Sequence, residues 1–260
     1  WQKPGQQNVA QELIKIIINY VAELRDNLKK EIERMRTTKT AKASIIRIAP
    51  PIVEEPSESL EPLKELFEKE ETAYRLSFTK SMETGIYASY RSIKECAFSN
   101  ITFIDSAFKS AQISDVVFRQ CDFSNISFAG SSFYRVEFID CKLMGTNFGE
   151  STFNHVRMIN CNSRYINLAM SKTNQMQFSR CDLQNGSLND CRLQATAFEH
   201  CSLIQADFSH TRLRNIDLRT SRINGLQINI SDLQGAIVSS IQAMELLPLL
   251  GVVINDDFQQ

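Results

Sequence analysis

The cysteines and histidines are the side chains of this chain that could bind a metal or carry redox chemistry. There are seven cysteines, and no two of them form a C-x-x-C pair. Their spacing argues against a zinc site and against the disulfide framework of a secreted protein. Five of the cysteines recur at every twentieth position, namely Cys121, Cys141, Cys161, Cys181 and Cys201. This regularity leaves two interpretations open, a metal or redox ladder or a set of small buried side chains.

Motifs for catalysis are absent from the sequence. It contains no glycine-rich phosphate loop, no G-x-S-x-G turn and no evident acid–base pair of carboxylates. The 29 basic and 30 acidic residues give a net charge of −1, which excludes a globally basic nucleic-acid binder. We therefore expect neither an enzyme nor a bound cofactor.

The elements that position these residues follow a period of five. Every fifth residue from Ile93 to Leu233 is apolar at 27 of 29 positions, the exceptions being Ser163 and Thr173. This series contains 13 of the 16 phenylalanines. All seven cysteines lie two residues before a member of the series, at a position that is otherwise mostly small. A period of five fits neither a helix nor a flat strand, so the chain must turn a corner at each repeat.

The stretches CDFSN, ADFSH, CDLQN and IDLRT resemble the A(D/N)Lxx motif of the pentapeptide-repeat family. The resemblance covers residues 91–237 and implies an all-β solenoid, a right-handed quadrilateral β-helix of about seven coils with four repeats in each coil. Equivalent positions in neighbouring coils are then separated by four repeats of the chain. We also expect an α-helical extension before the solenoid and a helical cap after it.

A coil of four repeats decides how the candidate chemical groups are placed. The cysteines stack in one inward column, which favours small buried side chains over a redox ladder. His155, His200 and His210 fall on three different faces, so they cannot converge on one metal. Asp122 and Lys142 are separated by one coil, as are Glu137 and Arg157, so we expect stacked surface ion pairs.

The segment before the solenoid divides into three parts. Residues 1–36 have the spacing of an amphipathic helix, which could pack on the rod or on a second copy, or bind a partner or a membrane surface. Residues 37–58 are polar and proline-rich, as in a linker. Residues 59–90 begin with an acidic helix that could plug the N-terminal end of the rod. The first residues lack the apolar segment of a signal peptide, and no run of about 18 apolar residues occurs. We therefore expect a cytoplasmic protein.

The stretch DLQGAIVSSIQAMELLPLLGVVIND, most of which lies in the predicted cap and dimerisation element of residues 238–260, resembles the C-terminal element of the quinolone-resistance (Qnr-type) members of the family. That resemblance implies a cap that also forms a homodimer, and it rests on Gly235, Gln242, Ala243, Leu250, Gly251, Val252 and Ile254. Independently, the spacing predicts an apolar helix face suited to a dimer interface, made of Ile241, Met244, Leu247 and Leu250. Pro248 departs from the pattern and is expected to kink or shorten the helix.

One face of the predicted rod, comprising residues 131–135 and the equivalent five residues of the next four coils, carries cations and no carboxylate. Its basic residues are Arg135, Lys172, Arg192, Arg212 and Arg214. This face is either simply solvated or is a contact surface for an acidic partner.

Two functions remain open at this stage. The Qnr-type resemblance implies a non-catalytic protein that binds type II topoisomerases (DNA gyrase and topoisomerase IV) and protects them from inhibitors, a form of antibiotic resistance. The alternative is a rigid scaffold for an unknown protein, with no topoisomerase role. Residues 91–235 hold 15 basic and 13 acidic residues, a net charge of +2, so mimicry of DNA by an acidic surface is poorly supported. We expect no membrane binding and no direct contact with nucleic acid.

Overall fold

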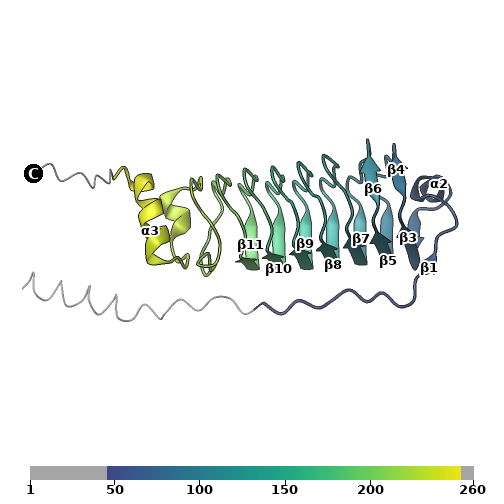
Figure 1. Cartoon of the computed structure of the whole chain (residues 1–260), viewed down its shortest axis with the longest axis horizontal. Coiled ribbons are helices and arrows are strands. Elements are labelled where there is room, and N and C mark those ends of the chain that lie inside the picture. The colour runs from purple at the N-terminus through teal and green to yellow at the C-terminus, as the bar shows by residue number, and fades with distance from the viewer. Residues whose placement is uncertain (1–45, 253–260) are drawn as a thin grey trace, which may run out of the picture. The chain divides into compact units, whose positions relative to one another are not determined.

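The computed structural model describes residues 46–252, and the predicted helix of residues 1–36 lies outside them. Figure 1 shows a rod of stacked coils with a short helix at each end. The N-terminal elements are β1 (Ser57–Glu58), α2 (Leu63–Lys69), β2 (Thr72–Tyr74), β3 (Leu76–Thr79) and β4 (Met82–Thr84). The rod continues through β5 (Ser92–Ser99), β6 (Thr102–Ile104), β7 (Gln112–Arg119), β8 (Ser132–Ile139), β9 (Thr152–Ile159), β10 (Lys172–Ser179) and β11 (Arg192–Glu199). It closes with η1 (Ile230–Leu233), α3 (Ser240–Leu246) and η2 (Leu247–Leu250).

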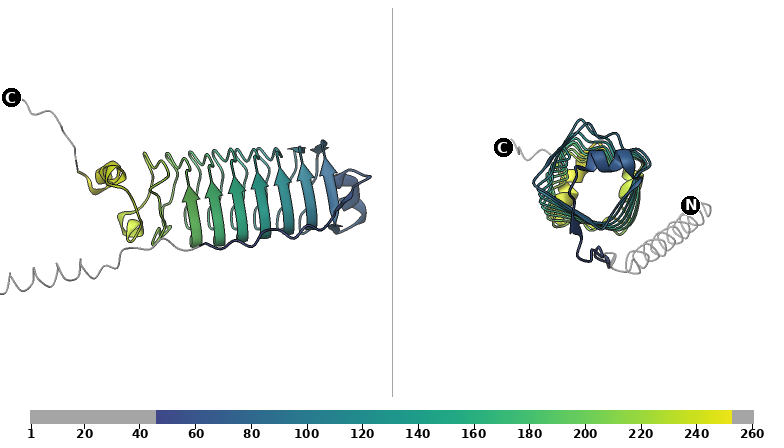
Figure 2. Two further views of the ribbon diagram at one scale, coloured as in Figure 1. Left: turned by 60° about the horizontal axis from the view of Figure 1, so that its bottom comes forward. Right: turned by 90° about the vertical axis from the view of Figure 1, so that its right-hand side faces the viewer.

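The strand pairs are parallel, and from β5 to β11 each pair joins one coil to the next, as in Ser132 with Thr152. The 9-stranded sheet has the order β1-β3-β5-β7-β8-β9-β10-β11, with β2 also pairing with β5. The other sides of the rod are joined by β4–β6 and by isolated parallel bridges such as Asp122 with Lys142 and Ser127 with Asn147. The end-on view in Figure 2 shows the resulting four-sided outline. The predicted quadrilateral β-helix is therefore confirmed.

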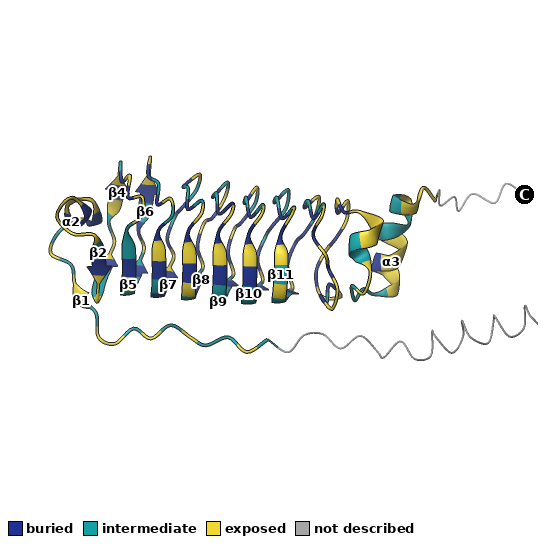
Figure 3. Ribbon diagram, turned by 180° about the vertical axis from the view of Figure 1, so that it is seen from behind, coloured by how far each residue is buried: buried dark blue, intermediate teal, exposed yellow. Residues whose placement is uncertain are grey.

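The inward series forms the core. Equivalent phenylalanines stack from coil to coil, as in Phe118 on Phe138 (ring centroids 5.0 Å apart) and Phe133 on Phe153 (5.0 Å). Rings on adjacent sides meet edge to face, as in Phe118 and Phe123 at 5.1 Å. Both arrangements suit the charge distribution of aromatic rings. Figure 3 shows buried and exposed stretches alternating along the strands.

Corners of the coil require an unusual backbone. The residue two positions after a series member commonly has a positive φ, for example 55° at Asp115, 61° at Asn125 and 67° at Gly145. Asparagine, aspartate and glycine tolerate this left-handed region best, and they recur at these positions. The corners at Asp115, Asn125 and Gly145 therefore have a local sequence reason, whereas other corners place residues such as Arg135 and Met170 in the same region.

The predicted start of the solenoid at residue 91 is wrong by one coil. Strand β2 pairs Thr72 with Ser92, and β3 pairs Phe78 with Phe98, so the first coil begins near Thr72. Only the short helix α2 precedes it within the predicted cap of residues 59–90. The inward positions of this coil include Ala73 and Glu83, which are both buried but give a weak apolar signal.

Both ends of the core are covered. At the N-terminal end α2 buries Leu63, Leu66 and Phe67, as expected for a plug. At the other end the amide of Gln242 donates to the carbonyls of Leu218 and Ser221, each at 2.7 Å. These bonds join α3 to the last coil of the rod and give the Ser221 carbonyl a donor, while the Leu218 carbonyl also accepts from the Ser221 N–H at 2.9 Å.

Pro248 shortens the C-terminal helix. The α-helix ends at Leu246 and continues as the 3-10 segment η2, which contains the proline and stops at Gly251 with φ of 72°.

None of the helices within residues 46–252 has the length and apolar character of a membrane-spanning helix.

Replacing Phe138 by alanine is expected to lower the free energy of unfolding by roughly 3–5 kcal/mol, as for other buried phenylalanines. Phe138 is fully buried and stacks on Phe118. Denaturant unfolding followed by circular dichroism measures the change. The control is Tyr165→Ala, whose exposed ring (55%) should make the loss less than about 0.5 kcal/mol. Equal, small losses in both variants would contradict the inward placement of Phe138.

Candidate partner-binding surface

The cysteines occupy the interior of the rod. All seven are free thiols and all are buried. Burial raises the pKa of Cys96 to about 11 and that of Cys191 to about 11. Thiols in the column of five donate to carbonyls of the coil below, as Cys161 does to Phe138 at 3.4 Å. Their environment is that of small buried side chains, in agreement with the second interpretation of their spacing.

The histidines lie on three separate corner columns, as predicted. His155, His200 and His210 each have a positive φ at a corner. No group of three or more potential metal ligands occurs among residues 46–252. The expected ion pairs are present: Lys142 Nζ lies 3.3 Å from Asp122 Oδ2, and Arg157 pairs with Glu137.

Arg135 does not contribute a free charge to the predicted basic face. Its Nε and Nη2 each donate to one oxygen of Asp115 at 2.6 Å, which makes a two-point ion pair between neighbouring coils. Asp115 belongs to the coil before the one at which the predicted face begins. Arg135 therefore differs from the other predicted cations in having a carboxylate partner, and its role in binding a partner stays a prediction.

Lys172, Arg192 and Arg212 form what we call the cation column. Their side chains are exposed, and Lys172 is the direct Cα partner of Arg192 in the parallel sheet. Among the residues that the structure describes, no carboxylate lies within 4.0 Å of any of the three. Like charges on neighbouring strands, whose backbones are about 4.8 Å apart, repel one another. The column thus presents unneutralised positive charge along the rod.

A groove of about 810 Å³ runs beside the cation column, and we call it the cation groove. The opposite wall is uncharged and consists of Tyr134, Asn154, Asn174 and Gln194. Asn174 donates to Asn154 at 3.1 Å, which links two of these side chains along the wall. The floor includes Leu193, a member of the inward series that is only half-buried. Arg214 is exposed but does not line the groove.

Residues 46–56, which we call the strap, belong to the linker predicted for residues 37–58 and lie along the rod (Figures 1 and 2). Backbone N–H groups of the strap donate to side chains of one corner column. Arg47 donates to Gln175 Oε1 at 2.7 Å, Ala49 to His155 Nδ1 at 3.1 Å, and Ile52 to Asp115 Oδ1 at 2.9 Å.

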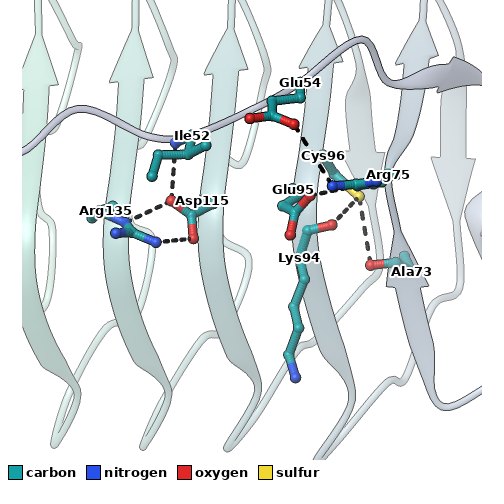
Figure 4. Close-up of polar contacts among 9 residues, drawn as sticks. All are labelled: Ile52, Glu54, Ala73, Arg75, Lys94, Glu95, Cys96, Asp115 and Arg135. Carbon is teal, nitrogen blue, oxygen red and sulfur yellow. Dashed lines mark hydrogen bonds and ion pairs between the residues drawn. The ribbon is translucent and has the colours of Figure 1, made fainter.

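The same corner column continues toward the N-terminal end of the rod. Arg75 Nε lies 2.6 Å from Glu95 Oε2, and Arg75 Nη2 lies 3.8 Å from Oε2 of Glu54 in the strap (Figure 4). Asp115 accepts from Arg135 in the next coil and from the strap at once. The sequence signal for this contact is the polar residue found at this position in each coil from Arg75 to Gln175. Its meaning becomes clear only once the segment that contacts the column is known.

The strap should loosen when Asp115 is replaced by alanine. Loss of a hydrogen bond to a charged acceptor, roughly 1.5–3 kcal/mol, should speed amide hydrogen exchange at Ile52 by about tenfold or more. Hydrogen-exchange mass spectrometry of the strap measures this. Asp122→Ala removes a matched ion pair with Lys142 that does not touch the strap. If both variants exchange like the unaltered chain, the strap does not depend on Asp115.

The matches to protein families agree with the geometry. The family described as "Pentapeptide repeat region" matches residues 131–194. The family described as "Pentapeptide repeats (8 copies)" matches residues 111–149, 177–215, 187–225 and 201–239. Together these ranges cover residues 111–239, all within the stacked coils of the β-helix. The chain belongs to the pentapeptide-repeat family.

Solved structures of the same kind were also found. One is QnrB1, a plasmid-mediated fluoroquinolone resistance protein, with 20% identity, 71% of this chain and 91% of that chain covered, and a TM-score of 0.41. Another is HetL from the cyanobacterium Nostoc sp. Strain PCC 7120, a pentapeptide repeat protein involved in heterocyst differentiation regulation. It has 12% identity, covers 64% of this chain and 86% of its own, and has a TM-score of 0.30. No curated protein matches the chain.

Proposed function

We propose that this chain is a non-catalytic binding protein that contacts a bacterial type II topoisomerase through the cation groove and protects the enzyme from inhibitors. The observation that carries the binding role is the cation column, which has no carboxylate within 4.0 Å among residues 46–252. The candidate target comes from the Qnr-type pattern of the C-terminal segment. Within that pattern, Gln242 closes the rod and Gly251 ends the last helical segment.

The alternative function is a rigid scaffold with no topoisomerase role. The strap supports it, because three backbone hydrogen bonds and one ion pair fix the chain that follows residue 45 to the corner column. A rod that anchors its own N-terminal segment could present that segment to another protein.

Gyrase supercoiling in the presence and absence of a fluoroquinolone separates these functions. The unaltered protein should raise the drug concentration needed for inhibition. A triple variant combines Lys172→Gln, Arg192→Gln and Arg212→Gln. Its protection of gyrase should be weaker by about tenfold or more, since three exposed charges are removed. Protection should also weaken as salt rises, because exposed charges are screened.

The matched control replaces three exposed cations on other sides, Lys109→Gln with Arg119→Gln and Arg180→Gln. It should protect like the unaltered protein. Full protection by the first triple variant would show that the cation groove is not the contact. If the unaltered protein neither binds nor protects gyrase or topoisomerase IV, the topoisomerase role is wrong and the scaffold function replaces it.

We also propose that the C-terminal end forms a homodimer. Ile241, Met244 and Leu250 are 67%, 54% and 58% exposed, while Leu247 is half-buried. Three large apolar side chains close together at one end of a rod favour a self-complementary contact with a second copy.

Ile241→Asp with Met244→Asp should convert the dimer to monomers, as measured by light scattering at micromolar concentration. Each substitution places a charge on both sides of a two-fold interface. Ile230→Asp is the control, because that residue is 51% exposed but lies outside α3 and η2. A monomeric unaltered chain would contradict the proposal.

A further inference from the structure

We infer that the cation groove is a docking site for an acidic α-helix of a partner protein, lying parallel to the rod axis. This inference rests on the binding role proposed above and specifies the chemistry of the partner. It does not depend on the partner being a topoisomerase.

The spacing of the cation column selects a helix over other anionic ligands. Lys172 pairs with Arg192 across one coil step of about 4.8 Å, and Arg212 follows one coil later, beyond the last strand pair, so the cation column spans roughly 10 Å along the axis. In an α-helix, residues i, i+3 and i+7 share one face and span about 10.5 Å. Carboxylates at i, i+2 and i+4 of an extended chain span about 13 Å. The helix therefore matches the three cations best.

The walls of the groove suit the same ligand. From Ser132 to Arg212 the groove crosses four coil steps, about 19 Å, which equals roughly three and a half helical turns. The uncharged wall of Tyr134, Asn154, Asn174 and Gln194 offers hydrogen-bonding groups. Half-buried Leu193 offers an apolar patch at the floor. An amphipathic helix can direct carboxylates to the cation column and an apolar side chain to Leu193.

Nucleic acid fits the groove less well. The cations stand in one straight file, whereas the phosphates of a duplex follow two strands that wind around their axis. Asp190 also lines the groove, next to the cation column. A ligand charged on every side would meet this carboxylate, while a helix charged on one side can turn its uncharged side toward it.

The probe is a fluorescein-labelled, stapled, alanine-based helix of about 14 residues, which is about four turns. It carries glutamates at i, i+3, i+7 and i+10 and a leucine beside that row. The control peptide has the same composition and staple, with the glutamates spread around the helix. Fluorescence anisotropy with the full chain should show at least tenfold tighter binding of the first peptide. Binding should weaken at high salt.

Charge reversal tests the site itself. Lys172→Glu with Arg192→Glu and Arg212→Glu should lower affinity for the one-faced peptide by at least tenfold. Lys109→Glu with Arg119→Glu and Arg180→Glu should leave affinity unchanged. Circular dichroism reports folding of each variant, and the corresponding glutamine triple replaces the first variant if the reversal unfolds the rod.

Equal binding of the two peptides, or unchanged binding by the charge-reversal variant, would overturn the inference. Tighter binding of a single-stranded oligonucleotide of equal charge would also overturn it and would indicate a nucleic-acid site. Peptide binding without any effect on gyrase would uphold the groove and reject the topoisomerase as its partner. Protection of gyrase without peptide binding would uphold the proposed function and reject the helix.

Discussion

Stacking of each coil on the one before it is the interaction on which every other feature of this molecule depends. The inward side chains contact their equivalents in the neighbouring coil, and the backbone of each coil bonds to the next, as Phe123 does to Lys142 at 2.8 Å. A shift by a single residue would turn the whole inward series toward solvent. The register is therefore fixed along the rod, and every outward side chain has a determined neighbour above and below it.

This fixed register makes the surface a set of columns, and the columns differ in how their charges are balanced. In the corner column Asp115 accepts hydrogen bonds from Arg135 and from the strap, so its charge is balanced by groups of the same chain. In the cation column Lys172 has Arg192 as its partner, and repulsion is left uncompensated. The contrast between these two columns is the physical basis for placing the partner at the cation groove.

Much of this architecture is predictable from the sequence because the inward positions are dominated by large apolar residues. Prediction fails where that signal fades. The first coil is missed in the sequence because Ala73 and Glu83, which are not large apolar residues, occupy inward positions there. The buried hydroxyl of Ser163, which has no hydrogen-bond partner, shows that the register tolerates even a polar residue within the stack.

The strap is unpredictable for a different reason. Its contacts use backbone N–H groups, which every residue except proline carries, so its own sequence has no signature. Its acceptors, Asp115, His155 and Gln175, are ordinary corner residues until a segment is laid across them. A basic face that is taken to begin at residue 131 leaves out Asp115, which lies one coil earlier. The ion pair between Arg135 and Asp115 is therefore missed. The cation column is predictable because its residues repeat in type as well as in spacing.

Engineered disulfides test the register of the stacked coils most directly. Lys172→Cys with Arg192→Cys joins Cα partners at about 4.8 Å, inside the range a disulfide can bridge. Lys172→Cys with Arg212→Cys leaves about 9.6 Å between the Cα atoms, which exceeds that range. Under mild oxidation of dilute protein, followed by peptide mass mapping, the first pair should form an intramolecular disulfide and the second should stay reduced. Oxidation of the second pair in preference to the first, or of both alike, would contradict the stacking on which the account rests.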